Sequence, residues 1–243
     1  MLLGSLLVVA ALVNNLFPPG GALRRLTSLD WSGYAVASDF SNPQPVIVGV
    51  RASWVVPTVL TSVDDSFCAV WVGIGGQFEG DGTLIQTGSE QDSVSGNAVY
   101  STWYELLPND SVTITSINVS PGDRMNASIS FVNSASNTWL IELEDITAEE
   151  KFTQEFVYSS SMLSAEWIVE RPSVDSTLSI LADFGSLTFT EAQATSSAGA
   201  GVISSFPFSQ VIMYDRQNRQ LVTVSSLTSK GSSFTVTFSG TVP

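Results

Sequence analysis

The chain has 243 residues and a formal net charge of −14, from 23 acidic and 9 basic side chains, and it contains no histidine. Without histidine it cannot form a Ser-His-Asp triad, a Cys-His dyad or a His-x-x-x-His zinc site. Its single cysteine, Cys68, cannot form an internal disulfide. The acidic balance argues against a nucleic-acid partner, and a lone thiol lacks the companions of a metal site, so we expect no nucleic acid, no metal and no cofactor.

The chain begins with an apolar run, Leu2–Val13, which is too short to span a bilayer and is typical of the core of a secretory signal. We therefore expect residues 1–27 to be a signal-like segment with a short linker, and the protein to be secreted into an acidic environment. Anchoring in a membrane by residues 2–17 is the less favoured alternative. Only 13% of the residues are charged, so few ion pairs exist to be lost in acid.

From residue 28 to residue 243 the pattern is typical of β-strands. Short alternating or apolar runs are separated by turn signals, and no stretch longer than about ten residues carries a helical period. The runs are Val46–Val50, Ala52–Val56, Ala69–Ile74, Ala98–Leu107, Val112–Val119, Met125–Val132, Thr138–Leu143, Phe152–Tyr158, Ala165–Glu170, Leu187–Thr190, Val211–Tyr214, Leu221–Val224 and Phe234–Phe238. This pattern predicts an all-β fold of two packed antiparallel sheets, a β-sandwich, as one monomeric domain over residues 28–243. Residues 172–183 and 194–205 are the least strand-like and are expected to be long loops.

A glycine-rich stretch, Trp71–Gly76, is followed by a second strand-like run, Leu84–Gly88, which carries one amide, Gln86. Gly75 and Gly76 can adopt the positive φ angles that the connection between these runs needs. Burying an amide without hydrogen-bond partners costs a few kcal/mol. Gln86 therefore either bridges backbone groups in the core or belongs to a polar site.

Two glutamates, Glu166 and Glu170, lie on one strand-like run on either side of Trp167–Val169. They share a face of the strand, yet their Cα atoms stand about 13 Å apart. The paired carboxyls of glycosidases stand roughly 5 to 9.5 Å apart, so whichever glutamate is catalytic needs a partner on another strand. The alternative is that both are rim carboxylates on a solvated sheet face.

Several motifs follow one another in a fixed order along the chain. They are Asp30–Tyr34 (DWSGY), Ala52–Pro57 (ASWVVP), Trp71–Gly76 (WVGIGG), Leu84–Gly88 (LIQTG), Trp103–Pro108 (WYELLP) and Ala165–Glu170 (AEWIVE). The ordered set resembles the glutamic peptidases, or eqolisins, and the resemblance covers most of the chain. It implies a sandwich similar to the concanavalin A-like or jelly-roll proteins and a pepstatin-insensitive acid endopeptidase that acts on proteins and peptides.

By motif position, the resemblance places the family's catalytic dyad on Gln86 and Glu170, with Glu166 open as the alternative acid. It also implies a substrate groove that is lined by Trp31, Trp71 and Glu105. Glu90 is implied as an acidic neighbour of the dyad. In the implied mechanism the glutamate takes a proton from a water and later returns it, while the glutamine stabilises the oxyanion. A glutamate with an ordinary pKa of about 4 is a poised base only in acid, so we expect an optimum below pH 5.

Two positions depart from the family pattern. Gly75 stands where an aspartate is usual, and Arg171 follows Glu170 where an acidic residue is usual, so a divergent prokaryotic member is expected. A second hypothesis for the same sandwich is a carbohydrate-binding or glycoside-hydrolysing protein that uses Glu105 with Glu170. A third is a surface domain without activity. Convergence of Gln86 and Glu170 on one water would favour the peptidase.

Overall fold

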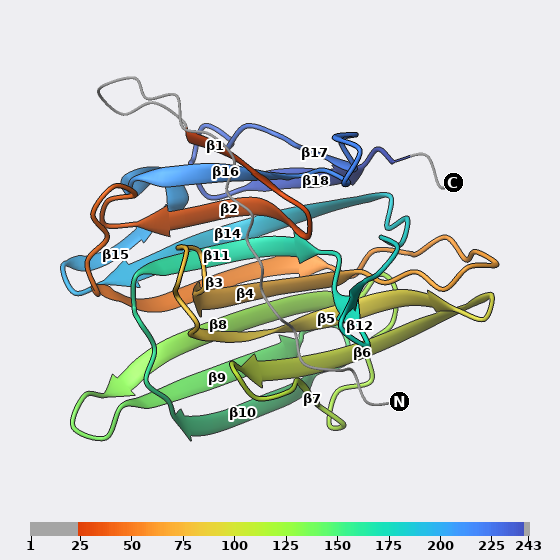
Figure 1. The fold of residues 1–243 in the computed structure, drawn as a ribbon. Helices are drawn as coiled ribbons and strands as arrows, with labels where there is room; N and C mark the ends of the chain where they lie inside the picture. Colours follow the sequence, from red (N-terminus) through yellow and green to blue (C-terminus); the bar gives the residue numbers. More distant parts are fainter. Residues whose placement is uncertain (1–23, 241–243) are drawn as a thin grey trace.

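The computed structural model describes residues 24–240, which form two large twisted β-sheets packed face to face (Figure 1). Sheet A has the strand order β1-β16-β2-β11-β4-β5-β6-β7. Its strands are β1 (Arg24–Ser28), β16 (Phe208–Met213), β2 (Trp31–Ala37), β11 (Ser164–Glu170), β4 (Ala69–Gly75), β5 (Leu84–Val94), β6 (Asn97–Leu106) and β7 (Val112–Thr113). β1 runs parallel to β16, whereas the other neighbours in this sheet are antiparallel.

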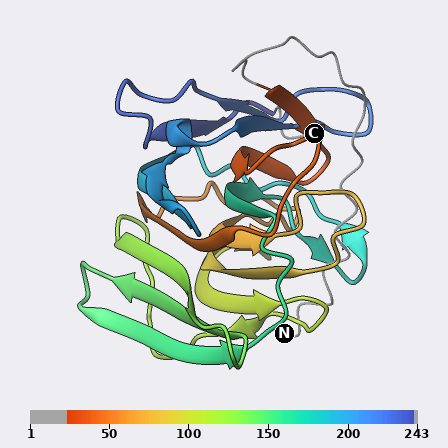
Figure 2. The same ribbon diagram turned by 90° about the vertical axis from the view of Figure 1, so that its left-hand side faces the viewer.

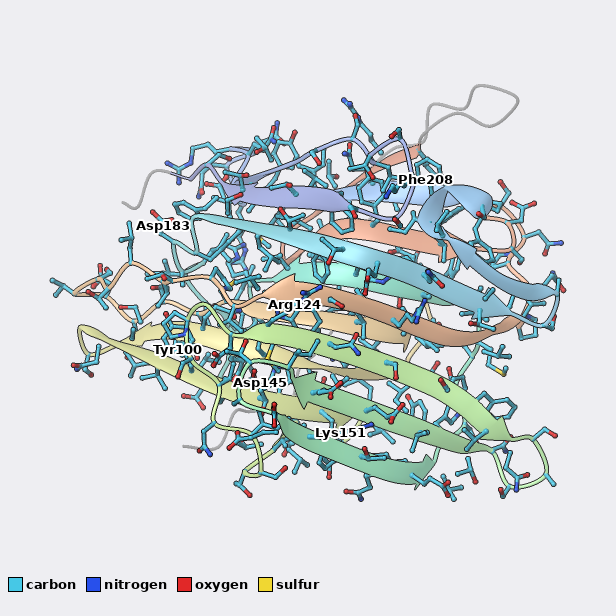
Figure 3. The ribbon with its side chains drawn as sticks, turned by 180° about the vertical axis from the view of Figure 1, so that it is seen from behind. Tyr100, Arg124, Asp145, Lys151, Asp183 and Phe208 are labelled. Carbon is cyan, nitrogen blue, oxygen red and sulfur yellow. The ribbon has the colours of Figure 1, made fainter. Side chains whose placement is uncertain are left out.

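Sheet B has the order β10-β9-β8-β3-β14-β18-β17, and β15 pairs with the far end of β14. Its strands are β10 (Glu150–Val157), β9 (Thr138–Asp145), β8 (Arg124–Asn133), β3 (Ile47–Val55), β14 (Ser186–Ser196), β18 (Phe234–Phe238), β17 (Val222–Val224) and β15 (Gly199–Val202). In Figure 2 the green strands β8 to β10 of sheet B and the yellow strands β5 and β6 of sheet A are seen as separate layers. Figure 3 views the molecule from behind, over the outer face of sheet B.

The expected all-β sandwich of two antiparallel sheets is confirmed. Within residues 24–240 no α-helix occurs, and the one helical element is the 3-10 turn Ile203–Ser205. That part of the chain accordingly contains no helix with the length and apolarity needed to cross a bilayer. Outside the two sheets, β12 (Ser173–Val174) and β13 (Thr177–Leu178) form a short hairpin.

The structure differs from the expected element boundaries at several places. Of the run Val112–Val119, only Val112–Thr113 forms a strand, β7. β1 begins at Arg24, so the boundary expected after residue 27 falls within a strand of sheet A; the rest of the signal-like segment, residues 1–23, lies outside the described residues. The prediction of a long loop over residues 194–205 was wrong, because β14 continues to Ser196 and turns back as β15. The two runs between residues 46 and 56 form a single strand, β3.

Side chains from both sheets fill the space between the layers. Alternation along β11 directs Trp167 inward with Ala165 and Val169, where these side chains join Trp54 and Trp139 of sheet B in one buried cluster. Strands β2, β4 and β11 are buried on both faces, which explains why β2 and β4 read as continuous runs of apolar and small residues; β11 is interrupted by Glu166 and Glu170.

The outer face of sheet A carries a second cluster of buried side chains. It contains the other three tryptophans of the chain with several aliphatic residues: Trp31, Ala69, Trp71, Leu84, Trp103, Leu107, Ile168 and Val211. We call this set the outer cluster. The rings of Trp31 and Trp71 meet edge to face, with their centroids 4.9 Å apart. The side chains at alternate positions of β11, β4, β5 and β6 are therefore set in an aromatic surface.

Glycine is required at two positions beneath the outer cluster. A Cβ added at Gly88 would lie 2.0 Å from the carbonyl oxygen of Val70 and 2.8 Å from the Cα of Trp71. A Cβ added at Gly73 would lie 2.9 Å from the Trp71 ring. The Trp71 side chain can therefore take its place only because these neighbours in β5 and β4 have no side chain. At the end of β4, Gly75 and Gly76 have φ angles of 95° and 85°, as their place in the connection requires.

We expect Gly88→Ala to destabilise the fold by about 3 kcal/mol or more, because the clash is with backbone atoms that cannot move aside. Urea unfolding followed by tryptophan fluorescence measures the change. Gly82→Ala is the matched control, because an added Cβ there meets nothing within 4 Å. Equal stability of the two variants would contradict the close approach of β4 and β5.

Candidate active site

Strand register brings four residues into one row across sheet A. Gln86 in β5 lies opposite Gly73 in β4 on one side and Glu105 in β6 on the other. Gly73 in turn lies opposite Glu166 in β11. This row puts two carboxyls and one amide on the face that carries the outer cluster, and its only position without a side chain is Gly73.

Glu170 belongs to a second row, four residues further along β11. It lies opposite Trp31 in β2 and Ala69 in β4, and Ala69 lies opposite Glu90 in β5. The register therefore separates Gln86 from Glu170 by two strand spacings, about 10 Å, and by about 13 Å along the strands. The two groups expected to form the dyad are on the same face but not directly opposite one another, so their convergence on one water stays a prediction.

Glu105 holds the amide of Gln86. Gln86 is fully buried, and its Nε2 donates to Glu105 Oε2 at 2.5 Å. Burial raises the pKa of Glu105 to about 7, against the opposing effect of the Gln86 hydrogen bond. No group of the described chain bonds to the other end of the amide, Oε1. Gln86 therefore does not bridge backbone groups in the core; its side chain is oriented by a carboxyl, and one acceptor remains available.

Trp71 holds the carboxyl of Glu170. The indole Nε1–H donates to Glu170 Oε2 at 2.6 Å. Burial is the main cause that raises the pKa of Glu170 well above its ordinary value; the nearby Asp30 and Glu105 add to the shift, and Trp71 and Trp31 oppose it. The expectation of an ordinary pKa near 4 for this glutamate was therefore wrong, because it assumed a solvated carboxyl.

Two other tryptophans lie on the same face of sheet A. Trp31, on the row of Glu170, and Trp103, on β6, are both buried in the outer cluster. The Nε1–H of Trp103 finds no acceptor within residues 24–240, whereas that of Trp31 lies close enough to Glu170 to lower the pKa of its carboxyl. The sequence predicts Trp31 as a groove residue, whereas it assigns Trp103 no role beyond its place in the motif Trp103–Pro108. Donors of this kind are suited to the carbonyl oxygens of a bound chain.

Glu90 and Asp92 form an acidic pair at one end of the site. They alternate on β5, so both project from the outer face of sheet A. Burial raises the pKa of Glu90 to about 7, with Ser101 opposing. Burial and the neighbouring Glu90 raise the pKa of Asp92 to about 8. Glu90 was expected close to the dyad and shares a row with Glu170; Asp92 was not foreseen, although its spacing of two from Glu90 placed it on the same face.

Glu166 is enclosed. It is fully buried, and neither of its carboxyl oxygens has a hydrogen-bond partner in the described part of the chain. Burial raises the pKa of Glu166 well above its ordinary value. The Trp71 ring and the Leu84 side chain approach Gly73, the residue between Glu166 and Gln86. Glu166 thus shares a row with Gln86 but has no hydrogen-bonded donor among the described residues, whereas the Trp71 indole donates to Glu170.

Gly75 stands where the family resemblance implies an aspartate, and the carboxylate of Asp81 lies close to that position. The Asp81 carboxylate accepts the backbone N–H of Gly76 at 3.0 Å and the hydroxyl of Ser161 at 2.6 Å. Its other oxygen accepts the backbone N–H and the hydroxyl of Thr83. Asp81 therefore returns an acidic group to the end of β4, where it also adds to the raised pKa of Glu166.

A model described as the peptidase A4 family matches residues 30–238. Aspergillopepsin-2 of Aspergillus niger is 31% identical over 179 residues, which are 72% of this chain and 60% of that protein, so the match spans less than two thirds of the relative. The crystal structure of aspergilloglutamic peptidase from Aspergillus niger has a TM-score of 0.62 and 28% identity, covering 72% of this chain and 99% of that one. Scytalido-glutamic peptidase with a transition state analog inhibitor has a TM-score of 0.72 and 22% identity, covering 86% and 98%, which shows a shared fold.

We expect the folded state to be most stable in acid and to lose stability between about pH 4 and pH 8. The pKa is raised to about 7 in Glu90 and Glu105 and to about 8 in Asp92. In the unfolded chain such carboxyls titrate near 4. Their neutral forms therefore favour the folded state, and the stability is complete below about pH 4 and lost as the pH rises through the folded values.

Melting temperatures recorded from pH 3 to pH 9 at constant ionic strength test this. Asp92→Asn should flatten the decline toward pH 8, because the variant has one buried acid fewer. Glu79→Gln, at an exposed position, is the control and should follow the parent curve. A melting temperature that stays constant or rises toward pH 8 would refute the burial of these carboxyls.

Proposed function

This chain belongs to the peptidase A4 family, the glutamic peptidases, and on that premise we propose that it is a secreted acid endopeptidase with Gln86 and Glu170 as its dyad. The observation that carries the proposal is the pair of oriented groups on one face of sheet A. Glu105 holds the Gln86 amide and Trp71 holds the Glu170 carboxyl. Both groups are set among tryptophans whose N–H donors suit a peptide chain.

In the proposed reaction, ionised Glu170 takes a proton from a water that lies between it and Gln86. The resulting hydroxide attacks the carbonyl carbon of the scissile peptide, and the C–N bond breaks as Glu170 returns the proton to the leaving nitrogen. Gln86 Nε2 carries two N–H groups, of which one donates to Glu105. The second can donate to the developing oxyanion, a contact that contributes about 3 kcal/mol to catalysis.

The choice of Glu170 over Glu166 rests on their surroundings. Burial does not separate them, because Glu166, Glu170 and Gln86 are all buried, but neither carboxyl oxygen of Glu166 has a hydrogen-bond partner in the described part of the chain. Glu170 has the Trp71 indole as an orienting donor and lies close enough to Glu105 for the two carboxyls to interact. Glu105 also contacts Gln86, so it links the two members of the dyad electrostatically.

The glycosidase hypothesis receives less support from the same geometry. A glycosidase needs two carboxyls free to act on opposite sides of one bond. Glu105 is engaged by Gln86 and buried beside it, so it is not free to be the partner of Glu170. We therefore propose protein and peptide chains as substrates of a monomeric enzyme.

We expect Glu170→Gln to lower kcat by at least about a thousandfold, because no base remains to activate the water. Gln86→Ala should lower it by about a hundredfold to a thousandfold, the loss seen for a single oxyanion donor. Glu166→Gln should retain measurable activity. Casein digestion measured in acid, with circular dichroism to establish folding, reports all three. An active Glu170→Gln variant beside a dead Glu166→Gln variant would transfer the role to Glu166.

We expect a bell-shaped pH profile that pepstatin does not alter, with an optimum higher than the value below pH 5 that an ordinary glutamate would give. The rising limb reports ionisation of Glu170, whose raised pKa moves it above the limb of an ordinary glutamate. Activity should fall above about pH 7, where Glu90 and Glu105 ionise. The rate of peptide cleavage from pH 2 to pH 9, with and without pepstatin, gives both results. Full activity at pH 9, or strong inhibition by pepstatin, would speak against the dyad.

A further inference from the structure

Three of the nine basic residues of this acidic chain gather at one end of the sandwich. Arg171, Arg216 and Arg219 line two adjoining pockets there that share Asp215. The smaller pocket has a volume of about 170 Å³. It is lined by polar groups on one side and apolar groups on the other: Arg171, Ser179, Asp215, Gln217 and Arg219, and Ile180, Leu181, Leu221, Phe238 and Gly240. We call it the Arg171 pocket.

Two hydrogen-bond donors of residues that line the Arg171 pocket have no acceptor in the described part of the chain. Arg171 donates from Nη2 to the backbone oxygen of Leu29 at 2.6 Å. Its Nε–H and the hydroxyl of Ser179 are shielded from solvent, and neither has a partner between residues 24 and 240. Burial lowers the pKa of Arg171, with Asp30 opposing. A partly buried guanidinium with an unused donor is stabilised by an anion.

The acid that lines the pocket is already engaged. The Asp215 carboxylate accepts Arg219 Nε at 2.6 Å and the backbone N–H groups of Gln217 and Arg219 at 2.9 and 2.8 Å. Asp215 and Arg219 therefore neutralise one another, and the three arginines exceed the two acids around them, Asp215 and Asp30, by one positive charge. Asp30 is the other acid that acts on Arg171, and its own carboxylate accepts the hydroxyl of Ser28 at 2.5 Å.

We propose that the Arg171 pocket binds a small carboxylate, with Arg171 and Ser179 holding its charged end and Leu181 and Phe238 contacting its apolar end. The pocket volume of about 170 Å³ is sufficient for an acetate-sized acid or the terminal residue of a peptide. The pocket shares no residue with the candidate active site. Its ligand is therefore an addition to the proposed substrate, and the inference does not rest on the proposed function.

The carboxylate could come from a free acid or from the C-terminus of a peptide, and titration calorimetry at pH 5.5 and constant ionic strength separates these sources. Acetate, N-acetylalanine and N-acetylalanine amide are the probes. We expect saturable binding of the two acids and none of the amide, which has no charge. Equal affinities of the two acids identify the site as one for free carboxylates. An N-acetylalanine affinity at least about tenfold higher identifies it as one for peptide ends, since the added contacts then contribute.

Arg171→Gln should weaken acetate binding at least about tenfold, the loss expected for a charge-assisted hydrogen bond. Ser179→Ala, which leaves the Arg171 contact with Leu29 intact, should weaken it severalfold and keeps the test valid if Arg171→Gln does not fold. The matched control is Arg124→Gln, with the same change of charge. Arg124 lies on β8 beside a separate pocket and is labelled in Figure 3.

Three results would overturn the proposal. The first is the absence of saturable acetate binding to the parent protein. The second is equal acetate affinity in the parent, Arg171→Gln and Ser179→Ala proteins. The third is an equal loss of binding in Arg171→Gln and Arg124→Gln, which would indicate a general effect of charge.

Discussion

The position of the Trp71 side chain is the constraint on which the candidate site depends. Its indole donates to Glu170, its ring packs against Trp31, and its far edge lies over Gly73. This placement requires Gly88 in the neighbouring strand, where any Cβ would strike the backbone of β4. Two glycines, two tryptophans and one acid are thus a single packing unit, and the orientation of the acid is a consequence of the packing.

Burial of the acidic side chains of sheet A is the second property on which the site depends. Sheet A carries acids on a face that apolar side chains cover, and the desolvation raises the pKa of Glu90, Asp92, Glu105, Glu166 and Glu170 in the same direction. Hydrogen bonds from neutral donors, not ion pairs, hold Glu105 and Glu170. Such an arrangement favours the folded state when the acids are neutral. The chemistry of the site and the acid stability of the fold therefore have one common cause.

The layer architecture could be predicted from sequence because alternation is a local property. The run from residue 164 to residue 170 directs every second side chain to one face, and the structure keeps that assignment. Register is not local. Whether Glu166 or Glu170 lies opposite Gln86 depends on how three distant strands slide past one another, and no feature within any one strand specifies it. The order of the family motifs identified Gln86, Glu166 and Glu170 as candidate site residues. Only the pairing of the strands showed which of them share a row.

Two other features were beyond sequence reasoning for distinct reasons. The β14–β15 hairpin, taken for a loop, consists largely of Ala, Ser, Thr and Gly, which have little hydrophobic contrast between faces. The raised pKa of Glu170 depends on how much water the surrounding rings exclude, a quantity that arises only after packing. Asp92, by contrast, was accessible through its spacing from Glu90 and was missed.

The parallel pairing of β1 with β16 bears on the order in which the chain assembles. Arg24 pairs with Ser209, so the first strand of sheet A has to wait for a partner from the last fifth of the sequence. During synthesis the amino-terminal strand leaves the ribosome early and keeps its backbone groups unpaired until β16 has emerged. Contacts of such long sequence separation slow folding and leave strand edges exposed in the meantime. Closure of sheet A at this edge is thus a late event, and it fastens the beginning of the domain to its end.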